Sequence, residues 1–485
     1  MPMAGAAMPE TESESPCESE TEPGSEPGSA AEGDSGEAGS AVSGGSAVGA
    51  GADSFTSTGL LHSPDPGVPD GVSATLAANE ELARRQPRGE PVLPLAFGEA
   101  GLPVHPALRS ALGAAAGRGS YGPVAGLTSL RAAAAGYWDR RGMPTSPEQV
   151  VCGPGSKPLL YGLLIAIGGD VAVPRPSWVS YAAQASLNGA RPHFVPTPPG
   201  EGGIPEPFLL AKAVSEARAA GREIRSVVVT LPDNPTGTMA RPATMRRLCR
   251  VAADHGLVII SDEIYRDLIH DPAAMVLSPA AVAPERTVVT TALSKSLALG
   301  GWRIGTARMP DGPGGAALRD RLLGIGSEIW STPSGPVQQA AAYAFDEPPE
   351  LTRRIAASRR LHATVARAVT DRFAAAGAPV ATPHAAFYLY PDLGPFRDRL
   401  RRAHGVTTGA GLAALLLRRY GMGVLPASAF GEDDDAMRLR VATGLLYGTT
   451  GTEQERALAA EDPLALPWIA DGLGRLCEIL ADLTG

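Results

Sequence analysis

Three lysines stand out in a chain that otherwise uses arginine for positive charge. Lys157, Lys212 and Lys295 are the only lysines among 42 basic residues. A lysine amine can lose its proton and attack a carbonyl, whereas an arginine cannot. Lys212 lies in the charged helical run AKAVSEARAAGR, where a surface charge is the simpler interpretation. Lys157 and Lys295 are therefore the stronger candidates for chemistry.

Polar or glycine-rich segments follow four apolar runs of the sequence. GPGSK begins at Gly153, PDNPTG at Pro232, SDEIY at Ser261 and SKSLALGGWR at Ser294. Ligands of open α/β sheets bind beyond the carboxyl ends of the strands. We therefore expect the four segments to meet at one site.

The elements that would position these segments alternate along the chain. Short β-branched runs are separated by helical stretches rich in Ala, Leu and Arg, which is typical of a mainly parallel sheet covered by helices. From about Leu351 a long Arg-rich helix precedes AAFYLYPDL, MGVLPASAF and MRLRVAT, which indicates a second, smaller α+β domain. The expected strands are Val150 to Cys152, Val171 to Val173, Val227 to Leu231, Leu257 to Ser261 and Thr287 to Thr291.

The first part of the chain differs in composition from the rest. Residues 1 to 83 hold 15 acidic residues and no Lys or Arg, and Phe55 is the only aromatic residue up to position 67. A segment of this kind cannot bury enough apolar area to offset its chain entropy. Residues 1–67 are therefore predicted to form a disordered acidic tail rich in Ser, Gly and Pro.

Composition also argues against several classes of protein. The longest apolar stretch, LLYGLLIAIGG from Leu159, is about half of the roughly 20 residues that a membrane-spanning helix needs. The N-terminus has no positively charged start followed by an apolar block, so we expect a cytoplasmic protein rather than a secreted one. Residues 1 to 83 contain no Lys or Arg, which disfavours binding of this segment to nucleic acid. Four cysteines without CxxC spacing predict neither a disulfide framework nor a metal site.

Several polar residues in these segments together meet the needs of one cofactor, pyridoxal 5'-phosphate. The protein must supply a lysine for the covalent link, an acid for the pyridine nitrogen, a donor for the ring hydroxyl and a grip on the phosphate. Lys295, Asp262, Tyr265 with Asn234, and Ser294 with Arg303 match those needs in that order.

The segment LSKSLALGGWRIG from Leu293 resembles the lysine signature of the class I/II aminotransferases, and the order of the other motifs is similar to that of the aspartate-aminotransferase-like group. One departure is Ala292, where that family usually has Gly or Ser. The resemblance covers about residues 68–485. It implies an α/β, fold type I enzyme with a mainly parallel seven-stranded sheet between helices and a smaller α+β domain.

The resemblance also implies domain limits. The N-terminal arm with part of the small domain would span 68–114. The large cofactor-binding domain would span 115–350, and the C-terminal small domain 351–485.

Roles for individual residues follow from the same resemblance. Asp262 would pair with the pyridine nitrogen and Tyr265 with the ring hydroxyl, while Trp178 would stack on the ring. The phosphate would lie at the N-terminus of a helix, where free amides suit an anion. The residues around the phosphate would be Gly155, Ser156, Lys157, Ser294 and Arg303, with Tyr121 reaching the phosphate of a partner subunit, which implies a homodimer.

The substrate would lie between the two domains. Arg438 of MRLRVAT matches the arginine that binds the substrate α-carboxylate, and Gly98, Asn234 and Trp178 match other residues on the substrate side. Arg440 stands where a small polar residue is usual. It could contact a substrate side chain, but a surface position is the favoured interpretation.

Each motif alone has a simpler explanation. Asp262 could cap a helix, and NPTG could be only a turn, since its residues are common turn formers. Their joint order favours an aminotransferase that moves an amino group between an amino acid and a 2-oxo acid. Alternatives are a non-transaminating enzyme with the same cofactor, such as a β-lyase, an aminocyclopropanecarboxylate-synthase-like cyclase or an amino-acid oxidase, and, more remotely, an aminotransferase-like regulatory protein.

Overall fold

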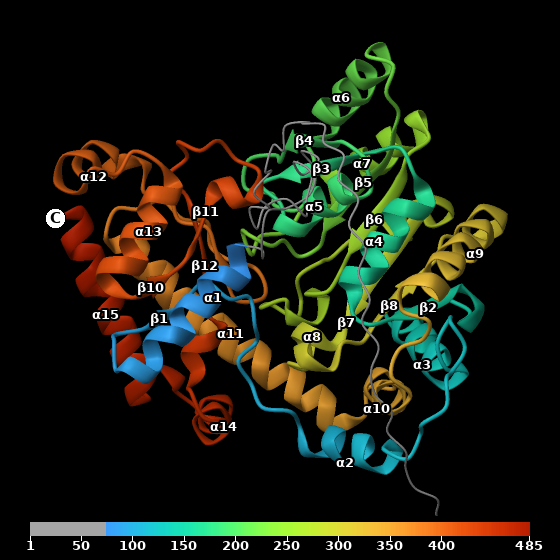
Figure 1. Ribbon diagram of the computed structural model, residues 1–485, viewed down its shortest axis with the longest axis horizontal. Helices are drawn as coiled ribbons and strands as arrows, with labels where there is room; N and C mark the ends of the chain where they lie inside the picture. Colours follow the sequence, from blue (N-terminus) through green and yellow to red (C-terminus); the bar gives the residue numbers. More distant parts are fainter. Residues whose placement is uncertain (1–73) are drawn as a thin grey trace, which may run out of the picture. The chain divides into compact units, whose positions relative to one another are not determined.

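A seven-stranded sheet forms the core of one of the two lobes of residues 74–485, the part of the chain that the computed structural model describes (Figure 1). The predicted tail of residues 1–67 lies outside the described residues. The strand order is β2-β8-β7-β6-β5-β3-β4. Strands β7, β6, β5, β3 and β4 run parallel, whereas β8 is antiparallel to β7 and β2, so the mainly parallel sheet predicted from the sequence is confirmed. The strands are β2 (Val150–Gly153), β3 (Asp170–Arg175), β4 (Pro192–Pro196), β5 (Ile224–Thr230), β6 (Val258–Asp262), β7 (Thr287–Ala292) and β8 (Gly305–Arg308).

Both faces of this sheet are buried under helices. In β5 the side chain of Val228 packs into one apolar cluster with α4, α5 and α9, while Val227 and Val229 pack on the opposite face with α6 and α7. Strands buried on both sides become continuous apolar runs rather than alternating ones. The covering helices are α2 (Pro106–Ala115), α3 (Thr128–Asp139), α4 (Ser156–Ile167), α5 (Val179–Leu187), α6 (Pro207–Ala219), α7 (Pro242–His255), α9 (Gly312–Ile329) and α10 (Gly335–Phe345), and a short helix, α8 (Leu293–Ser296), follows β7.

Two strands of the sheet have no counterpart among the strands expected from the sequence. β4 begins and ends with proline and is half-exposed at the sheet edge, so it lacks a buried apolar run. β8 has the sequence GTAR, in which Thr306 is the one β-branched residue. This strand is buried because it pairs with a neighbour on both sides. Neighbouring strands, rather than local sequence, stabilise both.

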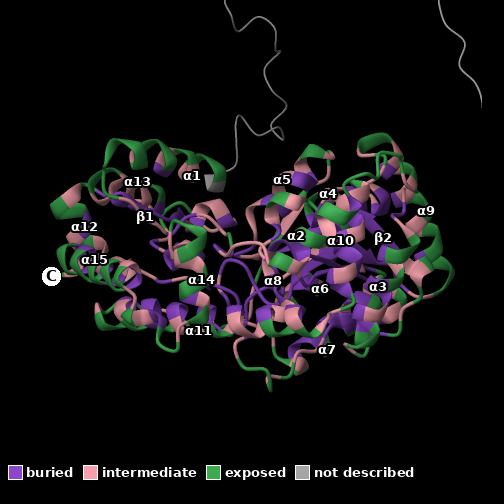
Figure 2. Cartoon of the chain, turned by 90° about the horizontal axis from the view of Figure 1, so that it is seen from below, coloured by how far each residue is buried: buried purple, intermediate pink, exposed green. Residues whose placement is uncertain are grey.

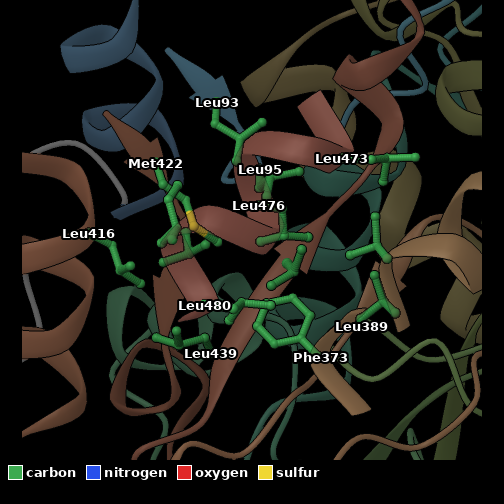
Figure 3. Close-up of a cluster of buried hydrophobic side chains, with 14 of the residues drawn as sticks. Leu93, Leu95, Phe373, Leu389, Leu416, Met422, Leu439, Leu473, Leu476 and Leu480 are labelled. Carbon is green, nitrogen blue, oxygen red and sulfur yellow. The ribbon is translucent and has the colours of Figure 1, made fainter. Parts of the chain in front are cut away.

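A second group of elements comes from both ends of the described chain. β1 (Leu93–Pro94) pairs in parallel with β10 (Met422–Gly423), and β9 (Tyr388–Leu389), β12 (Leu439–Ala442) and β11 (Leu425–Pro426) form a three-stranded sheet. Figure 3 shows the apolar cluster that holds this lobe together, in which Leu93 and Leu95 contact the same core as Phe373 and Leu476. The helices of this lobe are α1 (Ala74–Arg85), α11 (Pro349–Ala375), α12 (Arg397–His404), α13 (Gly409–Tyr420), α14 (Gly451–Ala459) and α15 (Pro467–Thr484).

Burial follows the layers. Buried residues gather around the sheet, and the outer faces of helices such as α9 and α13 are exposed (Figure 2). None of the helices between residues 74 and 485 is both long enough and apolar enough to cross a membrane. The same residues contain no cluster of three or more His, Cys, Asp or Glu side chains that could hold a metal ion.

Candidate active site

A cavity of about 580 Å³ lies beyond the carboxyl ends of β5, β6 and β7. All four segments expected to meet there have side chains near it, and three contribute the residues that end or follow those strands: Asn234, Asp262 and Lys295. Most of the residues predicted for the site line the cavity. They are Gly98, Ser156, Lys157, Trp178, Asn234, Asp262, Tyr265, Ser294, Lys295 and Arg303.

Lys295 projects into the cavity from α8, immediately after β7. Its Nζ donates a hydrogen bond to the carbonyl oxygen of Gly98 at 2.5 Å. Burial, and after it the charge of the nearby Arg440, lowers the pKa of Lys295 from 10.5 to about 8. At pH 7 roughly a tenth of this amine is therefore in the neutral form that a nucleophile or a base requires, far more than for an ordinary lysine.

Asp262 is the last residue of β6 and is almost fully buried. Its Oδ2 accepts a hydrogen bond from Tyr181 at 2.8 Å, and its Oδ1 accepts one from Thr290 at 3.3 Å. Burial raises the pKa of Asp262 to about 6, while these two hydrogen bonds act in the opposite direction. The group is a buried carboxylate whose charge would be stabilised by a cationic partner.

The N-terminus of α4 forms the opposite end of the cavity. Gly155 caps this helix with a φ of +92°, and a Cβ there would meet Nη2 of Arg303 at 2.3 Å. The backbone conformation therefore favours glycine here, and its missing side chain leaves room for the end of the arginine. Ser156 and Ser294 line the same end. Free helix amides, two hydroxyls and a guanidinium make this end a site for an anion.

Lys157 lies beside Trp178. Its Nζ is 5.0 Å from the centroid of the Trp178 ring, and burial, followed by the charge of Arg303, lowers its pKa. Trp178 itself packs edge to face against Tyr181, with ring centroids 5.2 Å apart. The indole face thus borders the cavity between the Asp262 end and the anion-binding end.

The structure reverses the positions expected for Arg438 and Arg440. Arg438 does not line the cavity: its side chain is 41 % exposed and is paired with Glu432 and Asp392. Arg440 is 1 % exposed and lines the cavity, so its expected surface position is wrong. Arg438 lies just before β12, next to these two acidic side chains. Arg440 lies within β12, where its backbone is paired with β11, and its side chain points inward.

The guanidinium of Arg440 is held by several groups. Nη1 donates to Oδ1 of Asn234 at 3.3 Å, and Nη2 donates to the carbonyl oxygen of Ala96. The rings of Tyr388 and Phe430 lie 5.1 and 5.2 Å from the guanidinium carbon. Within residues 74–485 the buried Nε has no hydrogen-bond partner. An unsatisfied buried donor at a cavity wall is suited to a ligand carboxylate.

Tyr121 is 89 % exposed and does not line the cavity of its own chain. Its expected contact with a partner subunit therefore stays a prediction. Tyr181, Tyr388, Thr230 and Glu99 also line the cavity but were missed from the sequence. The signal for Tyr181 was its spacing, since it lies one helical turn after Trp178 at the start of α5. Nothing in AAFYLYPDL distinguishes Tyr388 from Tyr390 before the strand is placed.

Comparison with known proteins agrees with this geometry. Residues 91–446 match the sequence model of the family described as aminotransferase class I and II. The chain belongs to this family. A probable aspartate/prephenate aminotransferase of Thermus aquaticus is 30 % identical over 378 residues, which cover 77 % of this chain and 92 % of that protein. An aspartate aminotransferase of Geobacillus stearothermophilus is 31 % identical and is covered to 95 %, with 79 % of this chain.

The structure of this aminotransferase is also similar to solved ones. The aspartate aminotransferase of Thermus thermophilus with maleate superimposes with a TM-score of 0.70 at 26 % identity, over 84 % of this chain and 97 % of that one. The expected α/β, fold type I architecture is confirmed. The protein is an enzyme that transfers amino groups, as its motifs predicted.

Proposed function

We propose that this aminotransferase binds pyridoxal 5'-phosphate at Lys295 and moves an amino group between an amino acid and a 2-oxo acid. The observation that supports it most strongly is that Lys295, Asp262 and Arg440 line a single cavity. A reactive amine, a buried carboxylate and a buried guanidinium are the groups that such a reaction needs at the cofactor and at the substrate.

The residues of the cavity fit the cofactor. The anion-binding end at Ser156, Ser294 and Arg303 would hold the phosphate, and the buried Asp262 would pair with the protonated pyridine nitrogen. Tyr265 and Asn234 would face the ring hydroxyl, and Trp178 would cover one face of the ring. When bound, the cofactor supplies an electron sink for the pair of electrons left on the substrate α-carbon.

Lys295 has two tasks in this proposal. Its Nζ would hold the cofactor in the resting enzyme, and the free amine would remove the proton from the substrate α-carbon. The lowered pKa of about 8 keeps part of this amine in the neutral form that a base must have. The carbonyl oxygen of Gly98 gives the freed amine a hydrogen-bond acceptor inside the cavity.

Arg440 binds the α-carboxylate of the substrate. Its planar fork can donate two parallel hydrogen bonds to a carboxylate, and its Nε lies buried without a partner among the described residues. Asn234, to which Arg440 donates, lies between the carboxylate site and the ring hydroxyl. This assignment replaces the expected role of Arg438, whose guanidinium is neutralised by Glu432 and Asp392 outside the cavity.

The functional unit is a homodimer in the cytoplasm. Tyr121 is a large exposed aromatic residue, and in the proposed dimer it would reach the phosphate of the partner subunit. Light scattering should then give about twice the chain mass of 49.7 kDa. Tyr121→Phe should weaken binding of pyridoxal phosphate without changing that mass.

The first test is an absorbance spectrum of the purified protein, followed by addition of single amino acids and then of a 2-oxo acid. Aspartate is the first donor to try because the relatives are named aspartate aminotransferases. A visible band that an amino acid bleaches and 2-oxoglutarate restores would support transamination. Release of ammonia or peroxide without recovery would favour a lyase or an oxidase instead.

Lys295→Ala should abolish turnover and the visible band of the lysine-linked cofactor. Lys212→Ala is the matched control because Lys212 is exposed and forms an ion pair with Glu216 of the same helix, α6. Turnover by the Lys295 variant close to that of the control would refute the role of Lys295.

A further inference from the structure

Tyr388 connects the two halves of the proposed site. It lies in β9, it is 1 % exposed, and its ring lines the cavity. Its hydroxyl oxygen is 2.9 Å from that of Tyr265, which follows β6 in the large lobe. Its ring lies against Arg440 on the adjacent strand β12, 5.1 Å from the guanidinium carbon. Tyr388 therefore contacts both the tyrosine proposed for the ring hydroxyl and the arginine proposed for the substrate carboxylate.

The direction of the hydrogen bond between the two phenols follows from what each must do. Both are buried, and burial raises the pKa of each, so both keep their protons near neutral pH. Each phenol has one proton to donate. If Tyr265 donates to the ring hydroxyl of the cofactor, Tyr388 must be the donor between the two. Tyr388 would then strengthen the hydrogen bond that Tyr265 makes, because donors in a chain polarise one another.

The position of the Tyr388 hydroxyl depends on a residue that has no side chain. A Cβ on Gly98 would lie 2.3 Å from this oxygen. The carbonyl of the same glycine accepts the hydrogen bond from Lys295. Gly98 therefore places its backbone between the reactive lysine and the hydroxyl of Tyr388, where any other residue would displace the phenol.

The ring of Tyr388 makes a second contact, with the guanidinium of Arg440. Together with Phe430 it borders the guanidinium of Arg440, whose charge is attracted to aromatic faces. Arg440 has no acidic partner among the described residues, and its anchors other than the rings are the oxygens of Asn234 and Ala96. The two rings thus orient the guanidinium of Arg440 toward a carboxylate and leave the charge of the guanidinium unneutralised.

We propose that Tyr388 is a positioning residue for transamination, orienting Tyr265 through its hydroxyl and Arg440 through its ring. The proposal rests on the proposed function of the site. Because Tyr388 belongs to the second lobe and Tyr265 to the sheet-containing lobe, their hydrogen bond also ties the cofactor side of the site to the substrate side.

Two substitutions separate the two contacts. Tyr388→Phe keeps the ring and removes the hydroxyl. We expect the Kd of the apoenzyme for pyridoxal phosphate, measured by tryptophan fluorescence, to rise about 5- to 10-fold, as for the loss of one buried hydrogen bond. The pH midpoint of the visible absorbance band should move upward, because a weaker donor leaves the ring oxygen more basic. The KM for the amino acid should change little.

Tyr388→Met fills much of the space but removes the ring as well. It should show the same cofactor effects and, in addition, raise the KM for the amino acid by roughly 10-fold. The control is Tyr390→Phe, which removes the hydroxyl that donates to Glu432 at 2.8 Å from a tyrosine that does not line the cavity. It should match the unmodified enzyme in all three measurements.

The outcomes are distinguishable. An unmodified enzyme without a visible band, or without its cycle of bleaching and recovery, would refute the proposed function before any variant is compared. If that enzyme behaves as expected but Tyr388→Phe has an unchanged Kd and an unchanged pH midpoint, the role of Tyr388 is refuted. Should the Met variant not fold, the Phe variant decides the question alone.

Discussion

Nη1 of Arg440 and Oδ1 of Asn234 meet at 3.3 Å although the two residues are 206 positions apart. Asn234 belongs to the loop after β5 of the large sheet, and Arg440 belongs to β12 of the second lobe. Their contact places an arginine of one lobe against the loop that follows β5 in the other. The proposed substrate carboxylate would therefore lie at the junction of the lobes.

Substitution of the two arginines of MRLRVAT should separate their roles. Arg440→Lys should lower kcat/KM for the amino acid by roughly 10- to 100-fold, since a point charge replaces a bidentate fork at a buried position. Arg438→Lys should change it less than about threefold, because the side chain is 41 % exposed and paired with acids. Steady-state kinetics of the two variants is the measurement. A larger loss at Arg438 than at Arg440 would reverse the assignment.

Asp262→Asn should keep the shape of the side chain but lose its charge. The amide cannot hold a proton on the pyridine nitrogen by ion pairing, so kcat should fall by at least roughly 100-fold. Its hydrogen bond with Tyr181 can be retained, so the apoenzyme should still fold. Single-turnover absorbance records the rate, and Asp311→Asn, which changes a carboxylate that does not line the cavity, is the control. Equal rates in the two variants would refute the role proposed for Asp262.

The pH dependence of stability should report the burial of Lys295. In the apoenzyme its pKa is about 8, against 10.5 when unfolded. Below pH 8 both states bind the proton, so the cost of burying the charge is present in full. Between pH 8 and 10.5 the folded state has already lost the proton, so this cost declines as pH rises.

Lys295→Met should therefore be more stable than the unmodified apoenzyme at pH 7, and the gain should shrink as pH increases through 8. Melting temperatures of both proteins from pH 7 to 10 test it. A gain that is constant across that range would show that the buried charge is not its source.

Phe373 should be a major contributor to the stability of the second lobe. Its ring is fully buried in the cluster of Figure 3 between α11 and residues of α15. Phe373→Ala should lower the free energy of unfolding by about 3–5 kcal/mol. Phe208→Ala removes an equally large ring that is 74 % exposed and should change it by less than about 0.5 kcal/mol. Denaturant titration of both variants tests the difference.

Much of the sheet and of its binding edge could be predicted from the sequence. The runs at Val171, Val227 and Thr287 are strands because both of their faces are buried, and such burial leaves a continuous apolar pattern. Segments such as NPTG and DEIY were predictable because the ends of parallel strands share one edge. Lys295 was conspicuous because so few lysines occur.

The residues that could not be assigned from the sequence are those whose positions depend on tertiary contacts. Arg438 and Arg440 both belong to MRLRVAT, and two residues on one strand face look alike until the neighbours of each are known. Glu432 and Asp392 draw Arg438 outward, and neither lies in that motif. In the same way the position of Tyr388 at the cavity depends on distant residues such as Tyr265, which precedes it by 123 positions.

The pairing of β1 with β10 also affects how the chain is made. Leu93 of β1 is paired with Met422 of β10. The first strand of the described chain therefore cannot pair until most of the polypeptide has left the ribosome. At usual rates of synthesis this interval is on the order of half a minute. During it Leu93 and Leu95 remain without their core, while the seven-stranded sheet can already form. The second lobe is thus the last part of the protein to mature, and nascent chains are the species that a chaperone would bind.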